Sequence, residues 1–454
     1  MPIIKSLTRV ILPLTLLLGF SPALWAANAQ LVIENVTIID GTGNAPRPNM
    51  SVVIDKGRII DIIHGKAKKV KSDSRVKGKG KFLIPGLVDA HIHLKGAYPK
   101  TIDGQTVMAG DRTLGVKTLH GFLYSGVTSV YDSGNLPDYI FGLRQDERDG
   151  KIMAPHIFAS GAIVTYPGSH GSQFGGALID DWPEAKSTLD HYLAQKPDVM
   201  KLTFEERGWG ARPLIPLLPL DLMQKAIAYA NDQGVRTTVH ASNEYRARQA
   251  LSVGIDNLSH PVIVGPITDE FARMMAAKQT PMVTTLTIGE RYSRLAEHPE
   301  YLDQALYQAT LTQDEIKKLK TETQKEYQER VWTWWMKIMT PIAQENLRKI
   351  HEAGGILVLG SDQSSGPSTH RELELVVAAG ISPIEAIRIG TLNAARFLGK
   401  DRDMGSIEIG KIADMVLLTA DPSKDINNAK AIAAVFKSGI EIDRSQLNLP
   451  VNQK

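Results

Sequence analysis

The chain has 454 residues, a formal net charge of +3, no cysteine and 43% hydrophobic residues. The absence of cysteine excludes disulfides, catalytic thiols and lipid attachment through cysteine. The near balance of acidic and basic residues gives no reason to expect nucleic acid or an anionic membrane as a partner. At this length we expect one large domain and one smaller domain.

Residues 1–29 have the features of a cleavable export signal. Lys5 and Arg9 give a positive start, residues 10–20 are apolar, and Ala27-Asn28-Ala29 offers a small-residue cleavage site. The apolar stretch is shorter than the ~20 residues that a membrane-spanning helix needs. We therefore expect a periplasmic or secreted protein without membrane attachment after cleavage, and an uncleaved anchor is the alternative.

Short strands are predicted at residues 30–39, 50–55 and 58–65, separated by turn signals such as Asp40-Gly41. From residue 82 onward, apolar strands alternate with helical segments, which predicts parallel βαβ units and the α/β class. The expected strands end near His91, Asp132, Gly161, Lys201, His240, His260, Thr285 and Asp362. These eight strands predict a TIM (β/α)8 barrel, a fold whose active sites lie at the carboxyl ends of the strands.

A helical, charged segment at residues 289–352 is too long for a plain βα connection. It carries Trp332, Trp334 and Trp335. We expect an extra helical hairpin packed on the barrel rim, and the alternatives are a lid over the pocket or a dimer surface. After residue 398 the strand pattern returns at residues 414–418 and 433–438.

The most informative motif is Asp89-Ala90-His91-Ile92-His93, which follows a buried apolar run. Side chains two residues apart on a strand point to the same face, so His91 and His93 offer two imidazoles to one point. Zinc and similar metals bind such ligands readily. A lone His-x-His pair is a weak signal, and a structural role for each histidine is the plain alternative.

Further polar residues lie in or at the ends of later apolar runs: Lys201, His240, His260 and Asp362. An unpaired ammonium group such as that of Lys201 is costly to bury. Each residue alone has an ordinary structural explanation, namely a core histidine or an exposed aspartate. Jointly, strands that end in metal-binding or lysine side chains predict one shared metal centre.

This ordered set of residues resembles the metal-dependent amidohydrolase superfamily, in its imidazolonepropionase-like and Xaa-Pro dipeptidase-like branch. The resemblance covers residues 31–442 and includes Thr391-Leu392-Asn393-Ala394-Ala395. It implies a barrel domain at residues 82–400 and a small β-sandwich domain built from residues 30–81 and 401–454. It also implies the metal ligands, which are His91, His93, Lys201, His240, His260 and Asp362.

Amide hydrolysis at neutral pH needs a strong nucleophile and a polarised carbonyl, and bound metal supplies both. The resemblance implies two divalent ions, with zinc favoured, bridged by Lys201 after carbon dioxide has converted it to N6-carboxylysine. The alternative is a single metal on His91, His93, His240 and Asp362, with Lys201 paired to Glu205 or Glu206. Asp362 is expected to accept the proton of the attacking water and deliver it to the leaving nitrogen.

The substrate-binding candidates lie in the loops that follow the strands. His170, in the glycine-rich loop 165–171, is expected to bind the substrate carbonyl or carboxylate, whereas His120 and His156 are interpreted as structural. His370 and Arg371 are candidates for binding an anionic end group, with a role at a helix start as the alternative.

The sequence departs from the dipeptidase pattern at two places. Ser242 stands where many Xaa-Pro dipeptidase relatives have tyrosine, and Tyr245 is the candidate substitute from the next turn. After Asp362, the segment Gln363-Ser364-Ser365 lacks the usual small apolar residue and glycine. Both departures leave the metal ligands intact and leave the substrate open.

The sequence therefore predicts an exported, metal-dependent amidohydrolase that cleaves a small substrate, either a dipeptide or an N-acyl amino acid. One alternative is hydrolysis of a cyclic amide such as an imidazolone or a hydantoin. Another is a periplasmic metal-binding protein without turnover. A homo-oligomer is compatible with the sequence, which gives no further clue to assembly.

Overall fold

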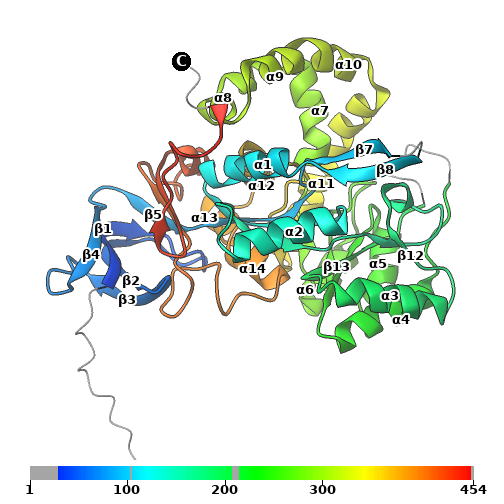
Figure 1. Cartoon of the computed structure of the whole chain (residues 1–454), viewed down its shortest axis with the longest axis horizontal. Helices are drawn as coiled ribbons and strands as arrows, with labels where there is room; N and C mark the ends of the chain where they lie inside the picture. Colours follow the sequence, from blue (N-terminus) through cyan, green and yellow to red (C-terminus); the bar gives the residue numbers. More distant parts are fainter. Residues whose placement is uncertain (1–28, 103–104, 207–213, 451–454) are drawn as a thin grey trace, which may run out of the picture.

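The computed structural model describes residues 29–102, 105–206 and 214–450, and the predicted export signal lies outside these ranges except for Ala29 (Figure 1). The fold is α/β, with parallel β-sheets in the large domain and a mixed sheet built from both terminal segments. Within the described ranges, no helix combines the length and apolar character needed to cross a membrane.

The terminal segments of the chain share one eight-stranded sheet, in the order β20-β19-β18-β5-β1-β2-β3, with β4 also paired to β1. Antiparallel pairing of β5 with β18 joins the two segments, for example at Ile84 and Val416. Alternate strand residues such as Ile33, Val52 and Met415 form a separate buried core. The strands are β1 (Ala29–Ile38), β2 (Arg47–Asp55), β3 (Arg58–His64), β4 (Ser72–Lys77), β5 (Phe82–Pro85), β18 (Met415–Leu418), β19 (Ile432–Lys437) and β20 (Ile440–Glu441).

The apolar run at residues 82–88, expected as one strand, forms parts of two strands that belong to different sheets. β5 ends at Pro85, and β6 (Leu87–Ile92) pairs with β9 of the large domain. Gly86 lies between them, where a Cβ atom would lie 2.0 Å from the Thr128 hydroxyl. A residue without a side chain is therefore required at this crossing between the two domains.

The large domain contains two groups of parallel strands. One has the order β10-β9-β6, and the other has the order β12-β11-β13-β14-β15-β16-β17. Backbone hydrogen bonds connect the groups, from Asp198 N to Ala159 O and from Ala90 N to Leu359 O, both 2.9 Å. The strands after β6 are β9 (Val127–Asp132), β10 (His156–Ala159), β11 (Val164–Thr165), β12 (Ala177–Leu178), β13 (Val199–Thr203), β14 (Arg236–His240), β15 (Asn257–Leu258), β16 (Met282–Val283) and β17 (Leu357–Val358).

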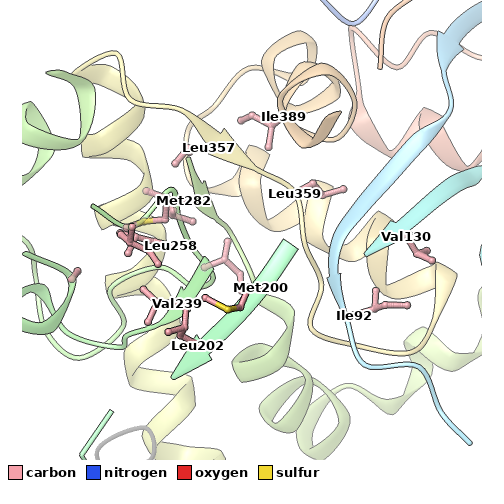
Figure 2. Close-up of a cluster of buried hydrophobic side chains, with 14 of the residues drawn as sticks. Ile92, Val130, Met200, Leu202, Val239, Leu258, Met282, Leu357, Leu359 and Ile389 are labelled. Atoms are coloured by element: carbon pink, nitrogen blue, oxygen red, sulfur yellow. The ribbon is translucent and has the colours of Figure 1, made fainter. Parts of the chain in front are cut away.

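Alternation along the strands separates the packed core from the polar site. Met200 and Leu202 belong to the large hydrophobic core, which also contains Val239, Leu258 and Met282 from the next strands (Figure 2). Lys201 lies between Met200 and Leu202, so its side chain points to the other face of β13. Burial of the apolar neighbours therefore fixes the direction in which the lysine faces.

Helices connect and cover the parallel strands (Figure 1). A separate two-stranded hairpin, β7 (Ala97–Ile102) and β8 (Gln105–Gly110), follows β6. The helices outside the segment 289–352 are α1 (Arg112–Tyr124), α2 (Pro137–Arg148), η1 (Ser172–Phe174), α3 (Glu184–Ala194), α4 (Leu220–Asp232), α5 (Glu244–Ser252), α6 (Asp269–Lys278), α12 (Gly366–Ala378), α13 (Pro383–Ile389), α14 (Leu392–Phe397) and η4 (Ile426–Lys430).

The segment 289–352 forms a group of helices that projects beside the hairpin (Figure 1). Buried Glu372 of α12 accepts hydrogen bonds from the backbone N–H groups of Leu286 and Thr287, both 2.8 Å, and so holds the start of α7. Within the group, Trp332 and Trp335 stack at 5.0 Å between ring centroids. The elements are α7 (Thr287–Glu297), η2 (Pro299–Asp303), α8 (Ala305–Thr310), α9 (Gln313–Lys318), η3 (Leu319–Thr323), α10 (Gln324–Glu329) and α11 (Val331–Glu352).

His156 joins the two domains and makes the stability depend on pH. Its ring nitrogens lie 3.1 Å from Glu147 of α2 and 3.2 Å from Asp414, just before β18. Burial alone lowers the pKa of His156, but the two carboxylates outweigh it and raise the pKa from 6.5 to about 9. A raised folded-state pKa gives stability that is complete below pH 6.5 and is lost as the pH rises through about 9.

We therefore expect His156→Gln to lower the free energy of unfolding at pH 6 by up to about 3 kcal/mol. At pH 10 the difference between wild type and variant should be small, because the wild-type imidazole is then neutral. Denaturant unfolding of both proteins across this pH range measures the difference. A difference that is independent of pH would contradict the ionic role of His156.

Candidate active site

The predicted metal ligands and His170 meet at the carboxyl ends of the parallel strands. A cavity of about 410 Å³ is lined by His93, His170, Lys201, His240, His260 and Asp362, together with Thr203 and a set of apolar residues. His91 is buried directly beside them, with its ring 4.7 Å from that of His260 and 5.4 Å from that of His93. The structure thus brings all six predicted metal ligands and His170 into one place.

Three of these residues, His91, His260 and Asp362, offer ligand atoms within 4.8 Å of one another. Asp362 Oδ1 lies 3.8 Å from His91 Nε2 and 3.5 Å from His93 Nε2. The rings of His240 and His260 are 4.5 Å apart, which extends the cluster toward Lys201 and His170. A carboxylate surrounded by imidazoles is a suitable donor set for a divalent transition metal.

Hydrogen bonds on the outer ring nitrogens orient two of these histidines. His93 Nδ1 lies 2.8 Å from the carbonyl oxygen of Gly134, which requires a proton on Nδ1. The lone pair of His93 is then on Nε2, which faces Asp362. Similarly, His260 Nδ1 lies 3.0 Å from the hydroxyl of Thr285. Such outer contacts are typical of metal-binding histidines.

Burial keeps the histidines in the form that binds metal. Desolvation lowers the pKa of His91, His240 and His260 well below the usual value, and neighbouring cationic groups lower it further. These imidazoles are therefore neutral at neutral pH, which is the form of histidine that binds metal. Burial raises the pKa of Asp362, while His93, Lys201 and Arg291 act in the opposite direction.

Lys201 fits a metal site better than an ordinary salt bridge. Among the described residues, neither Lys201 Nζ nor His91 Nε2 has a hydrogen-bond partner, although both atoms are buried. Burial lowers the pKa of Lys201 to about 7, so much of the amine is neutral at neutral pH. The neutral amine is the form that reacts with carbon dioxide.

Glu205 and Glu206, the alternative partners of Lys201, contact other residues of the described chain. Glu205 accepts a hydrogen bond from the Ser242 hydroxyl, and Glu206 pairs with Arg246 at 2.8 Å. Ser242, which replaces the tyrosine of many dipeptidase relatives, is therefore buried against Glu205 and is absent from the described cavity wall.

The backbone of Asp362 is strained, and its segment is held by Asp89, a residue for which the sequence predicted no role. Its φ angle of +51° is left-handed, an unusual conformation for a residue other than glycine, and its N–H donates to His91 O at 2.7 Å. Buried Asp89 accepts hydrogen bonds from Ser361 N at 2.9 Å and from Thr369 Oγ1 at 2.8 Å. Asp89 thus connects the segment of His91 to that of Asp362. Its position in the Asp-x-His-x-His motif is the sequence feature that could have indicated this role.

His170 lies beside the metal candidates and lines the same cavity. Its ring stacks on that of His240, with 4.4 Å between centroids. Thr203 Oγ1 and Thr165 Oγ1 donate hydrogen bonds to His170 O at 2.7 and 2.9 Å, which fixes the loop against β13. His170 is therefore close enough to contact a substrate in the cavity.

The other substrate-binding candidates lie elsewhere. Tyr245, His370 and Arg371 are not among the described residues that line the cavity. Tyr245 is 64% exposed, and His370 is buried with Nε2 2.7 Å from Ser125 O. Arg371 forms ion pairs with Glu290 and Glu374, at 2.8 and 2.7 Å, so it connects α12 to α7. These contacts give His370 and Arg371 structural partners in place of an anionic substrate group.

Arg291 of α7 is a cation near the site that the sequence did not reveal. It donates a hydrogen bond to Gln363 Oε1 at 2.6 Å, next to Asp362. Its charge lowers the pKa of Asp362, after the larger effects of burial, His93 and Lys201. The helical segment 289–352 therefore contributes electrostatically to the site, which no local sequence pattern could indicate.

Comparison with known proteins agrees with this arrangement. Residues 82–441 match the amidohydrolase family. An ochratoxinase from Aspergillus niger is 26% identical over 436 residues, covering 88% of this chain and 84% of the relative. An imidazolonepropionase from Shouchella clausii is 36% identical over 440 residues, covering 85% of this chain and 86% of the relative.

A solved structure of a Xaa-Pro dipeptidase with bound methionine has a TM-score of 0.69 at 22% identity, covering 91% of this chain and 99% of that chain. This likeness shows the fold. The family match favours catalysis over the alternative of a metal-binding protein without turnover. The chain belongs to the amidohydrolase family and is a hydrolase that acts on carbon–nitrogen bonds.

Proposed function

We propose that the protein is a metal-dependent hydrolase that cleaves the amide bond of a small substrate, either a dipeptide or an N-acyl amino acid. The observation that carries this proposal is the convergence of buried imidazoles, Lys201 and Asp362 on one cavity of about 410 Å³. The family is typically metal-dependent, and relatives include an ochratoxinase and Xaa-Pro dipeptidase-like structures. We further propose that the parallel strands form a closed (β/α)8 barrel.

The residues that would hold metal are His91, His93, His240, His260 and Asp362, with Lys201 as a bridging N6-carboxylysine between two ions. The neutral imidazoles and the buried Lys201 amine without a hydrogen-bond partner among the described residues support this assignment. When bound, divalent metal lowers the pKa of water and polarises a carbonyl, and zinc is the ion that this donor set favours.

The chain's own residues supply proton transfer and orientation. Asp362 accepts a proton from the attacking water and delivers it to the departing nitrogen, because its carboxylate lies in the cavity among the histidines. His170, stacked on His240, donates a hydrogen bond to the substrate carbonyl or carboxylate. The strained backbone of Asp362 and its hydrogen bond to His91 O hold the carboxylate in place.

Metal removal and a substrate panel test this function. We expect the purified protein to hydrolyse some dipeptides or N-acyl amino acids, to lose this activity when chelated and dialysed, and to recover it with zinc. Atomic emission analysis should give about two metal ions per chain. Activity that survives removal of all metal would contradict the proposal.

Hydrolysis of a cyclic amide is the second candidate, because a relative at 36% identity over most of both chains is an imidazolonepropionase. Assaying imidazolone and hydantoin compounds alongside the open-chain amides distinguishes the two candidate functions. Turnover of a cyclic amide with none of any open-chain amide would replace the first candidate by the second.

We also propose that the protein is exported to the periplasm or secreted. This proposal rests on the sequence of residues 1–29, in which a positive start, an apolar stretch and a small-residue cleavage site follow one another.

A further inference from the structure

A second cavity lies next to the candidate active site. It has a volume of about 910 Å³ and shares Met108 and Leu136 with the first cavity. Its other lining residues come from the end of β8, the start of α1, α2 and the end of α3, and they include Arg112, Tyr139, Phe141 and His191. Met108 and Leu136 therefore line both cavities and lie between them.

Besides its polar residues, the first cavity is lined by six apolar residues: Leu94, Ala97, Met108, Leu136, Ala162 and Ile163. These residues lie on segments that follow β6, β9 and β10, whereas Lys201, His240 and His260 lie on or after β13, β14 and β15. One part of the cavity thus carries the metal candidates and another part is apolar. An amide substrate bound here would place one of its halves against apolar side chains.

Met108 and Leu136 differ in how firmly they are held. Leu136 precedes α2 and is followed by Pro137, the first residue of that helix. Met108 lies on the β7–β8 hairpin, which is fastened at its base by the hydrogen bond from Asp111 N to Gly96 O at 2.7 Å. Met108 is nevertheless 48% exposed, so space remains around this flexible side chain. Met108 is therefore the movable part of the wall between the cavities.

We propose that Met108 determines substrate size. Its side chain separates the apolar part of the first cavity, where the acyl or amine half of the substrate would bind, from the space of the second cavity. The substrate class is then an amide with one apolar half that packs against Met108, Leu136 and Ile163. This inference rests on the proposed function and names the substrate class of the same site.

Two substrate series test the proposal: N-acyl alanines with acyl chains of increasing length, and N-acetylated amino acids with side chains of increasing apolar size. In one series, wild-type kcat/KM should rise about four-fold for each added methylene that is buried, until the first cavity is full, and then fall. Met108→Ala should move the maximum to longer groups, and Met108→Trp should move it to shorter ones. Met153→Ala, at another exposed methionine that lines neither cavity, is the matched control and should leave the profile unchanged.

Binding of n-alkanoic acids and n-alkylamines of the same lengths, measured by calorimetry, gives a second readout that needs no turnover. A size maximum that shifts in opposite directions in the alanine and tryptophan variants supports the proposal, whether it is seen in turnover or in binding. A flat size profile, or one that both variants leave unmoved, overturns it. A wild-type protein that hydrolyses no amide refutes the proposed function instead, and the binding profiles then decide the role of Met108 alone.

Discussion

Lys201→Ala is expected to lower the metal content from about two ions per chain to one or none, and to reduce kcat/KM by about 10³-fold or more. The reason is that the buried amine has no hydrogen-bond partner among the described residues and lies in the cavity with the metal candidates. A bridging carboxylate formed on Lys201 would join two cations that the neutral histidines cannot join alone. Metal analysis and steady-state kinetics on purified wild type and variant measure both effects.

The same substitution should destabilise the metal-free protein only slightly. An unpaired buried amine costs free energy, so its removal offsets part of the loss of packing. Urea unfolding of both proteins after chelation checks this expectation, and Lys225→Ala, on the exposed surface of α4, serves as a control. Lys201→Glu, which supplies a shorter carboxylate, should recover part of the metal binding. One ion in both wild type and Lys201→Ala would reject the bridge and favour cyclic-amide hydrolysis.

Asp362→Asn should retain most of the metal and lose about 10³-fold in kcat. The asparagine amide keeps an oxygen that can face the cation. Because a neutral amide is too weak a base to accept the proton of water, proton transfer to the leaving nitrogen fails. Hydrolysis of the best substrate, measured with metal content on the same sample, separates loss of chemistry from loss of metal. Activity within a few-fold of wild type would remove Asp362 from the role of general acid and base.

Ser361→Ala provides a matched comparison. Ser361 Oγ donates to Asp89 at 2.7 Å and belongs to the hydrogen-bonded link between the His91 and Asp362 segments. Loss of this one bond should reduce kcat by about 10-fold, far less than Asp362→Asn. An equal loss in the two variants would mean that the Asp362 effect reflects misplacement of the segment.

Local patterns predicted the polar site well because its residues follow buried strands. His91, Lys201 and His240 lie within strands, and His260 and Asp362 follow strands within a few residues. The carboxyl ends of parallel strands packed side by side point the same way, so order along the chain was sufficient to predict that these side chains meet. Tyr245, His370 and Arg371 are near the predicted ligands in sequence. Nearness in sequence alone does not show whether a side chain faces the cavity.

Long-range contacts decided what the sequence could not show. The ion pairs of Arg371 with Glu290 and the approach of Arg291 to Gln363 join segments about 70 to 80 residues apart, and no local periodicity records such pairs. Local periodicity also does not show that the apolar run at residues 82–88 is divided between two sheets. The division lies at Gly86, which packs closely against Thr128 of β9. Both features depend on which elements become neighbours after folding.

By itself, the sequence determined the α/β class, the alternation of strands and helices and the set of metal-ligand candidates, because hydrophobic periodicity and the positions of histidine, lysine and aspartate are local properties. The tertiary structure decided the rest: the orientation of each imidazole, the lowered pKa of Lys201, and the apolar wall with Met108 between two cavities. These properties depend on burial and on contacts between distant segments, which exist only when the chain is folded.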